Sequence, residues 1–184
     1  MSKEDARMVE AVLDGQVDAF SLLLDKYYGM LYKYFSVMLN VDDEKVEDLC
    51  QDTFLAAYKG LSSLRNTEQF KSWVFGIASN KLKTEFRKRK KERNAEESIR
   101  DEEKIRQEEI DTEVQEERIR DAVWKGLSHL DKKMKDVVTL KYFANLSYEE
   151  IGEVLDIPKS TVRGRMYRAY QTLRTIFKED TGGV

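Results

Sequence analysis

The segment from residue 146 to residue 169 predicts two short helices separated by a tight turn. Ser147 and Glu150 have the spacing of a capping box, in which a hydroxyl and a carboxylate satisfy the free backbone N–H groups at a helix start. Pro158 cannot continue a helix but suits the first turn of a new one, so the second helix should begin close to it. This arrangement is typical of a helix-turn-helix, whose second helix enters the major groove of DNA.

The second of these predicted helices carries cations but no carboxylates. No Asp or Glu occurs between Lys159 and Lys178. Apolar side chains recur at helical spacing from Val162 to Leu173 and should face inward. The side chains expected to point outward are Ser160, Arg163, Gly164, Tyr167, Arg168, Gln171 and Arg174. Because a solvated helix normally mixes charges of both signs, we interpret this face as a DNA reader; a basic surface helix is the alternative.

The composition favours an all-α fold. The 184 residues include one Pro and nine Gly, and β-branched residues are scattered rather than alternating. Charged residues make up 36% of the chain and the net charge is −3, so a uniformly basic DNA-coating protein is excluded.

Little in the composition suggests catalysis. Cys50 and His129 are the single Cys and the single His, which allows no disulfide within the chain and predicts no metal site. The sequence has no nucleophile–base pair and no Gly-rich phosphate loop, so we expect no cofactor and no enzymatic activity. It also has no signal peptide and no apolar run long enough for a bilayer, which predicts no membrane insertion and a cytoplasmic location.

Charge divides the chain into three parts. Residues 1–91 form a helical domain rich in aromatic side chains, residues 92–117 form a flexible linker dominated by carboxylates, and residues 118–184 form a second helical domain that contains the helix-turn-helix. The linker has too few apolar residues to bury a core of its own. It should repel DNA, and it could cover a basic surface.

A predicted helix over residues 44–60 has an acidic stripe with one leucine in it. Asp48, Gln51, Asp52, Leu55 and Lys59 share this stripe, whereas Phe54 and Cys50 fall on the apolar face. The stripe could bind a basic partner helix, or it could be an ordinary solvated face. The spacing alone favours neither.

A second predicted helix, over residues 70–91, combines an apolar body with one unusual stripe. Its basic block at residues 87–91 could bind phosphates, or it could be an ordinary solvated helix end. The stripe, however, places an aromatic ring, an amide and cations together, which are the groups that stack on unpaired bases and hold phosphates. The residues of the stripe are Trp73, Gly76, Asn80, Lys83, Thr84 and Arg87.

Three segments in this order resemble bacterial sigma factors of the sigma-70 family. Residues 46–58, VEDLCQDTFLAAY, resemble the helix of region 2 that binds core RNA polymerase. Residues 70–80, FKSWVFGIASN, resemble the segment that melts and reads the −10 promoter element. Residues 127–173 resemble region 4, which binds the −35 element. The short linker is similar to that of the extracytoplasmic-function group.

The resemblance implies a role for each stripe. Docking on the clamp helices of core RNA polymerase would involve Asp48, Gln51, Asp52, Phe54 and Leu55. A pocket for a flipped-out base and a track for the single strand would involve Arg65, Asn66, Trp73, Asn80, Lys83 and Arg87. Contacts with the −35 duplex of promoter DNA would come from Ser160, Thr161, Arg163, Arg165, Tyr167 and Arg168. The family also implies an anti-sigma factor as a partner.

The helix-turn-helix departs from the family pattern in its second helix. Gly164 stands where the family often has serine, which removes a hydroxyl and costs the helix up to about 1 kcal/mol. Lys159 and Ser160 replace the usual small, Gly-containing helix start, and they could add phosphate contacts.

Two other functions fit parts of the pattern. A conventional helix-turn-helix regulator would bind duplex DNA alone, usually as a dimer on symmetric half-sites. A single-strand RNA binder could use Trp73 and the basic block, but it would leave the helix-turn-helix unexplained.

Overall fold

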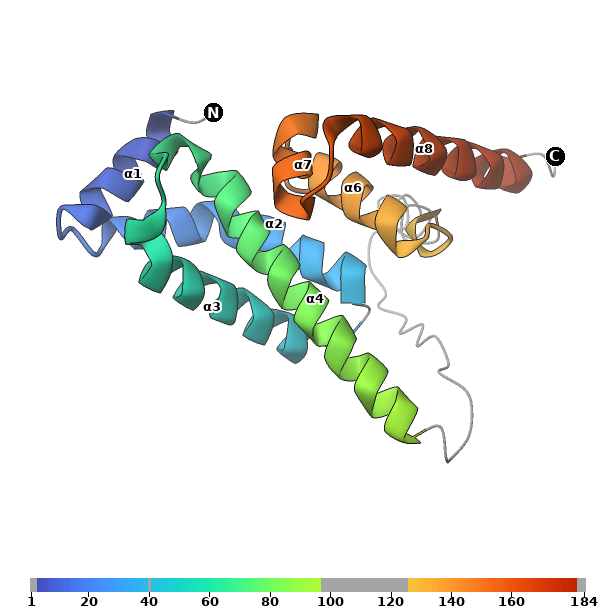
Figure 1. Cartoon of the computed structure of the whole chain (residues 1–184), viewed down its shortest axis with the longest axis horizontal. Helices are drawn as coiled ribbons and strands as arrows, with labels where there is room; N and C mark the ends of the chain where they lie inside the picture. The colour runs from blue at the N-terminus through green and yellow to red at the C-terminus, as the bar shows by residue number, and fades with distance from the viewer. Residues whose placement is uncertain (1–2, 40, 97–125, 182–184) are drawn as a thin grey trace.

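All regular secondary structure in the described part of the chain is helical. The computed structural model describes residues 3–39, 41–96 and 126–181. Within these ranges helices are joined by short turns and no strand occurs (Figure 1). This confirms the predicted all-α fold.

The N-terminal unit, residues 3–96, packs its helices around α2. Its elements are α1 (Lys3–Leu13), α2 (Ala19–Leu39), α3 (Asp43–Gly60), the short 3₁₀ helices η1 (Leu61–Ser63) and η2 (Thr67–Gln69), and α4 (Phe70–Glu96). Asp42 begins α3 by accepting a 2.9 Å hydrogen bond from the backbone N–H of Lys45. Aromatic side chains form much of the core of this unit, and Tyr27, Tyr34, Phe35 and Phe75 are fully buried.

A buried carboxylate ties α1 to α2. Asp5 accepts hydrogen bonds from the Tyr27 hydroxyl at 2.5 Å and from the Lys26 ammonium at 2.7 Å. These bonds to Asp5 raise the pKa of Lys26, and burial together with Asp5 raises the pKa of Tyr27. The first helix is thereby fixed against the helix that organises the unit.

The C-terminal unit, residues 126–181, contains the helix-turn-helix. Its principal elements are α6 (Lys132–Tyr142), α7 (Tyr148–Leu155) and α8 (Lys159–Thr181). Asp131 begins α6 by accepting a 2.7 Å hydrogen bond from the backbone N–H of Met134. Ser147 and Glu150 form the predicted capping box at the start of α7. Burial acts to raise the pKa of Glu150, but the hydrogen bonds with Ser147, together with nearby positive charges such as Lys71, lower it overall.

The two units pack against each other. Helix α7 lies against α4, and α6 lies against α2 (Figure 1). The Lys71 ammonium in α4 donates a 2.7 Å hydrogen bond to the backbone carbonyl of Asn145, and the Lys132 ammonium lies 3.5 Å from the centre of the Phe86 ring. Buried apolar residues of both units belong to one continuous core. The sequence did not predict this contact.

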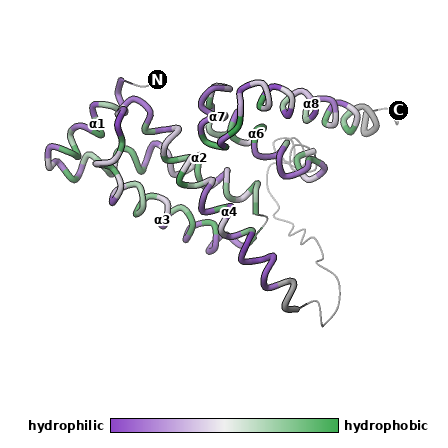
Figure 2. Tube along the Cα trace, in the orientation of Figure 1, coloured by the Kyte–Doolittle hydropathy of each residue, from purple (hydrophilic) through white to green (hydrophobic). Residues whose placement is uncertain are grey.

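The boundary predicted at residue 91 falls inside a helix. Helix α4 continues to Glu96, and its C-terminal part is strongly hydrophilic (Figure 2). Most of the predicted acidic linker, from residue 97 to residue 117, lies outside the described residues.

Candidate nucleic-acid interface

Helix α8 presents an exposed polar face on the outside of the C-terminal unit. Ser160, Arg163 and Tyr167 are exposed, and 65% of the surface of Tyr167 is accessible. Val162 and Ala169, on the opposite side, are fully buried. The structure therefore places the polar side of this helix where a duplex could reach it.

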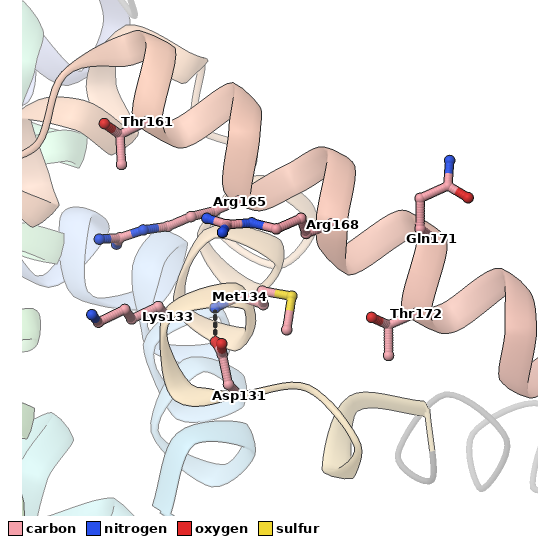
Figure 3. Close-up of a pocket in the computed structure, with 8 residues that line it drawn as sticks. All are labelled: Asp131, Lys133, Met134, Thr161, Arg165, Arg168, Gln171 and Thr172. Atoms are coloured by element: carbon pink, nitrogen blue, oxygen red, sulfur yellow. Dashed lines mark hydrogen bonds between the residues drawn. The ribbon is translucent and has the colours of Figure 1, made fainter.

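A second side of α8 faces a crevice rather than open solvent. The crevice has a volume of about 540 Å³ and lies between α8 and the beginning of α6 (Figure 3). Thr161 and Arg165 are half-buried there, and Arg168 is exposed at its edge. Its lining residues are Asp131, Lys133, Met134, Thr161, Arg165, Arg168, Gln171 and Thr172. The six residues predicted for the −35 duplex are thus divided between two sides of one helix.

The turn before α8 is held by close backbone contacts. A Cβ atom at Gly152 would lie 2.8 Å from the carbonyl oxygen of Ile157, so only glycine fits there without a shift. Asp156 has φ +56° and ends α7 in the left-handed conformation. Lys159 forms an ion pair with Glu149 of α7. Because of this pair, Lys159 helps to join the two helices.

The predicted single-strand stripe of α4 lies on the surface of the N-terminal unit. Asn80 and Arg87 are exposed, and Lys83 is half-buried with its ammonium 3.4 Å from the amide oxygen of Asn80. Helical spacing puts Lys71 and Phe86, which contact the C-terminal unit, on a different side of α4 from Asn80 and Arg87. The packing of the two units therefore leaves Asn80 and Arg87 exposed.

The loop before α4 lies close to this stripe in the chain. Arg65 and Asn66 are exposed. The amide oxygen of Asn66 accepts a 3.1 Å hydrogen bond from the backbone N–H of Glu68, which leaves the amide NH₂ group to meet a base. Trp73 is half-buried, with its ring centre 6.0 Å from that of Phe70. Trp73 therefore presents only part of its ring to solvent.

The acidic stripe of α3 is exposed. Asp48, Gln51 and Asp52 are exposed, and Leu55 is 51% accessible. Asp52 also pairs with Lys81 of α4 at 3.3 Å. Phe54, however, is only 4% accessible, so it can support a docking partner from below but offers it little surface.

An apolar groove runs beside this stripe, between α2 and α3. Its volume is about 370 Å³. The polymerase-binding residues predicted from the sequence all lie on α3, so the contribution of α2 was missed. No local pattern could reveal it, because the groove exists only where the two helices meet. The lining residues are Phe20, Leu24, Tyr28, Gln51, Phe54, Leu55 and Tyr58.

One carboxylate lies where the two units meet. Burial raises the pKa of Asp136 to about 6, although Lys132, Arg165 and Lys83 act in the opposite direction. Lys83 and Arg165 were predicted for different DNA elements, and both influence this one group. Cations of both units therefore act on the carboxylate of Asp136.

Neither a candidate metal site nor a membrane-spanning helix occurs among the described residues. No group of three or more His, Cys, Asp or Glu side chains among them could hold a metal ion. None of the helices in the described ranges is long and apolar enough to cross a bilayer.

Comparison with known proteins gives matches over both units. The family described as Sigma-70 region 2 matches residues 21–92, and the family described as Sigma-70, region 4 matches residues 120–173. The ECF RNA polymerase sigma-E factor of Haemophilus influenzae is 30% identical, over 92% of this chain and 93% of that protein. The ECF RNA polymerase sigma factor SigW of Bacillus subtilis is 28% identical, over 91% of this chain and 94% of that protein.

Solved structures show the same fold. The structure of CnrH in complex with the cytosolic domain of CnrY has a TM-score of 0.72 at 23% identity, covering 97% of this chain and 99% of that chain. The sigma factor RpoE in complex with the anti-sigma factor NepR from Bartonella quintana has a TM-score of 0.66 at 23% identity. That match covers 84% of this chain and 95% of the other.

Proposed function

Since the chain belongs to the extracytoplasmic-function group of RNA polymerase sigma factors, we propose that it binds core RNA polymerase and directs it to specific promoters. In this role it recognises the −10 and −35 elements and assists DNA melting. It is an initiation factor and catalyses no reaction itself. It acts in the cytoplasm, where the polymerase meets the chromosome.

One observation supports this function most strongly. Two polar, cation-bearing faces, on α4 and on α8, are both exposed, and they belong to separate helical units. A regulator with a single helix-turn-helix needs only the face on α8. A second face that combines Trp73, Asn80 and Arg87 suits unpaired bases and phosphates.

The −10 element is assigned to the N-terminal unit. Extruding a base from the duplex costs a few kcal/mol, and the protein must return this energy through contacts with the flipped base. The exposed amide groups of Asn66 and Asn80 can donate to a base edge, while Lys83 and Arg87 hold the displaced strand. Arg65 and the exposed part of Trp73 complete this surface.

The −35 element is assigned to α8. Arginine is suited to bidentate contact with guanine in the major groove, and Arg163 lies on the exposed side. Ser160 and Tyr167 lie on the same side of the helix. Thr161, Arg165 and Arg168 are closer to the crevice and are suited to the DNA backbone.

Polymerase docking is assigned to α3 and the groove beside it. Leu55 supplies the exposed apolar contact, and Asp48, Gln51 and Asp52 supply a polar, acidic rim. Phe54 forms the floor of the groove. Such a surface suits an amphipathic partner helix with basic flanks, as found on a coiled-coil clamp.

An anti-sigma factor is the expected regulator. The relative RpoE is described in complex with the anti-sigma factor NepR. By analogy with that complex, we propose that an inhibitor covers the promoter-binding or polymerase-binding surfaces of this chain until a signal releases it.

Run-off transcription tests the function directly. Purified chain and core polymerase are mixed with a library of genomic fragments, and transcripts are mapped to their start sites. We expect starts at fragments that share two spaced sequence elements, and none when the chain is omitted. A complete lack of chain-dependent transcripts across the library would contradict the proposal.

Arg168→Ala separates the two activities of the chain. We expect this variant to lose affinity for the −35 duplex while it still binds core polymerase. Equal loss of both activities would contradict the assignment of α8 to DNA alone.

A further inference from the structure

The crevice between α6 and α8 collects cations from two different helices. Lys133 comes from the first turn of α6, whereas Arg165 and Arg168 come from the middle of α8. In Figure 3 both arginine side chains extend along the crevice above α6, and Lys133 reaches toward the same side. The sequence placed Arg165 and Arg168 among the DNA-binding residues but gave no role to Lys133.

Among the described residues no carboxylate forms an ion pair with these three cations, although Arg165 acts on the pKa of the nearby Asp136. Among the described residues, carboxylates form ion pairs with Lys26, Lys45, Lys81, Lys88, Arg89 and Lys159, but not with Lys133, Arg165 or Arg168. Asp131 lines the same crevice, yet one of its carboxylate oxygens is engaged by the backbone N–H of Met134 at 2.7 Å. Like charges gathered in this way repel one another. An anion between them would remove this repulsion.

The other lining residues suit an oxyanion. Thr161 and Thr172 carry hydroxyl groups, and Gln171 carries an amide, all of which can donate hydrogen bonds to phosphate oxygens. The volume of about 540 Å³ and the open side leave room for a phosphate that is part of a chain.

We propose that this crevice binds a backbone phosphate of duplex DNA, and that Lys133 of α6 is a phosphate-contacting residue. The inference rests on the proposed −35 function of α8. The ligand is assigned to DNA rather than to a free anion because the crevice borders the exposed face of α8 that carries Arg163 and Tyr167. A duplex lying on that face brings its sugar-phosphate backbone alongside the helix.

The proposal divides the work of α8 between its two sides. Arg163 and Tyr167 read base edges, whereas Arg165 and Arg168, together with Lys133, fix the position of the duplex. Contacts of the second kind carry no sequence information, but they contribute to affinity and to its dependence on salt.

The salt dependence of promoter binding tests the role of Lys133. Holoenzyme is assembled from core polymerase and the wild-type chain, the Lys133→Gln variant or the Lys33→Gln variant, and binding to one promoter is measured at several salt concentrations. Lys33 is a matched control, since it is an exposed lysine on α2 and outside every proposed interface. Thermal unfolding confirms that each variant is folded.

Loss of one phosphate contact has a defined signature. We expect Lys133→Gln to reduce the slope of log affinity against log salt by about 1, which makes affinity about fourfold less sensitive to a fourfold change in salt. The loss should be the same on promoters with different −35 sequences. Lys33→Gln should keep the wild-type slope.

The remaining outcomes separate this inference from the proposed function. If the wild-type holoenzyme binds promoters and Lys133→Gln keeps the wild-type slope, the crevice is not a phosphate site for DNA. If the wild-type chain directs no promoter binding at all, the proposed function itself fails. Inorganic phosphate is a further probe: NMR shifts at the crevice with an unchanged slope in Lys133→Gln would assign the site to free anions and overturn the inference.

Discussion

The ammonium group of Lys71 in α4 donates a 2.7 Å hydrogen bond to the backbone carbonyl of Asn145, just before α7. Asn145 has φ +49°, a left-handed conformation that turns the chain between α6 and α7. Lys71 is half-buried, and this burial lowers the pKa of its ammonium group. The pair joins the unit assigned to the −10 element to the unit assigned to the −35 element.

We expect the two units to separate at the promoter, because the −10 and −35 elements assigned to them lie far apart along the duplex. Elements centred about 25 base pairs apart span about 85 Å of duplex, at about 3.4 Å per base pair. Helix α8 has 23 residues and is about 35 Å long. We therefore expect the contact between Lys71 and Asn145 to break when both elements are bound.

Energy transfer between two labels measures this separation. Dyes are attached at Gly29→Cys in α2 and Thr175→Cys in α8; the first position has open space around it and the second is exposed. Cys50 is buried, and burial raises its pKa to about 12, so it should remain unlabelled. We expect transfer to fall when core polymerase and promoter are added. Unchanged transfer in a transcribing complex would show that the units stay packed.

Asp136 should make stability depend on pH. Because its pKa is raised from 3.8 to about 6, mainly by burial, the folded protein binds the proton more tightly than the unfolded chain. The contribution of Asp136 to the free energy of unfolding therefore falls as pH rises from 3.8 to about 6. Asp136→Asn has no charge to bury and should raise the melting temperature more at pH 8 than at pH 4.

The control for this experiment is Asp25→Asn. Asp25 is an exposed carboxylate on α2, so its replacement should shift the melting temperature little at either pH. An equal shift for Asp136→Asn at both pH values would contradict the argument from burial.

Two glycines of the helix-turn-helix should respond in opposite ways to alanine. At Gly152 the new Cβ would lie 2.8 Å from the backbone oxygen of Ile157, and such overpacking costs about 1–3 kcal/mol. At Gly164, inside α8, no heavy atom lies within 4 Å of the new Cβ, and alanine should stabilise the helix by up to about 1 kcal/mol. Denaturant unfolding of both variants measures whether each substitution raises or lowers the free energy of unfolding. Destabilisation by Gly164→Ala would mean that the helix is distorted there.

Leu55 should matter for polymerase binding and little for folding. It is about half accessible and lines the groove between α2 and α3, so truncation to alanine removes an exposed apolar contact. We expect Leu55→Ala to weaken binding to core polymerase by about tenfold or more, the size typical of an interface hot spot. Leu22→Ala is the matched control, because Leu22 is 52% accessible but does not line the groove. Equal affinities of the two variants for core polymerase in a pull-down titration would show that Leu55 is not part of the docking surface.

Local chemistry made the helix starts predictable. Acidic or hydroxyl side chains at Asp42, Asp131 and Ser147 accept hydrogen bonds from backbone N–H groups within the next three residues, so a short stretch of sequence is sufficient to place them. The buried faces of α7 and α8 followed from helical spacing for the same reason.

Contacts between distant segments could not be predicted in this way. Lys71 and Asn145 are 74 residues apart, and the sequence around one of them gives no indication that it contacts the other. Phe20 of α2 packs against Phe54 of α3, with ring centres 6.4 Å apart, and the groove that they help to line is not visible in the sequence of either helix. Lys133 was missed because its role depends on the position of α8.

Footprinting of the polymerase-bound complex tests the central claim most directly. Hydroxyl radicals are used to cleave promoter DNA in the presence of core polymerase alone and of core polymerase with this chain. We predict that the chain adds protection over two separated stretches, at the −35 and the −10 elements, with increased reactivity of unpaired thymines in the second. Protection of only one stretch, or of neither, would contradict the account.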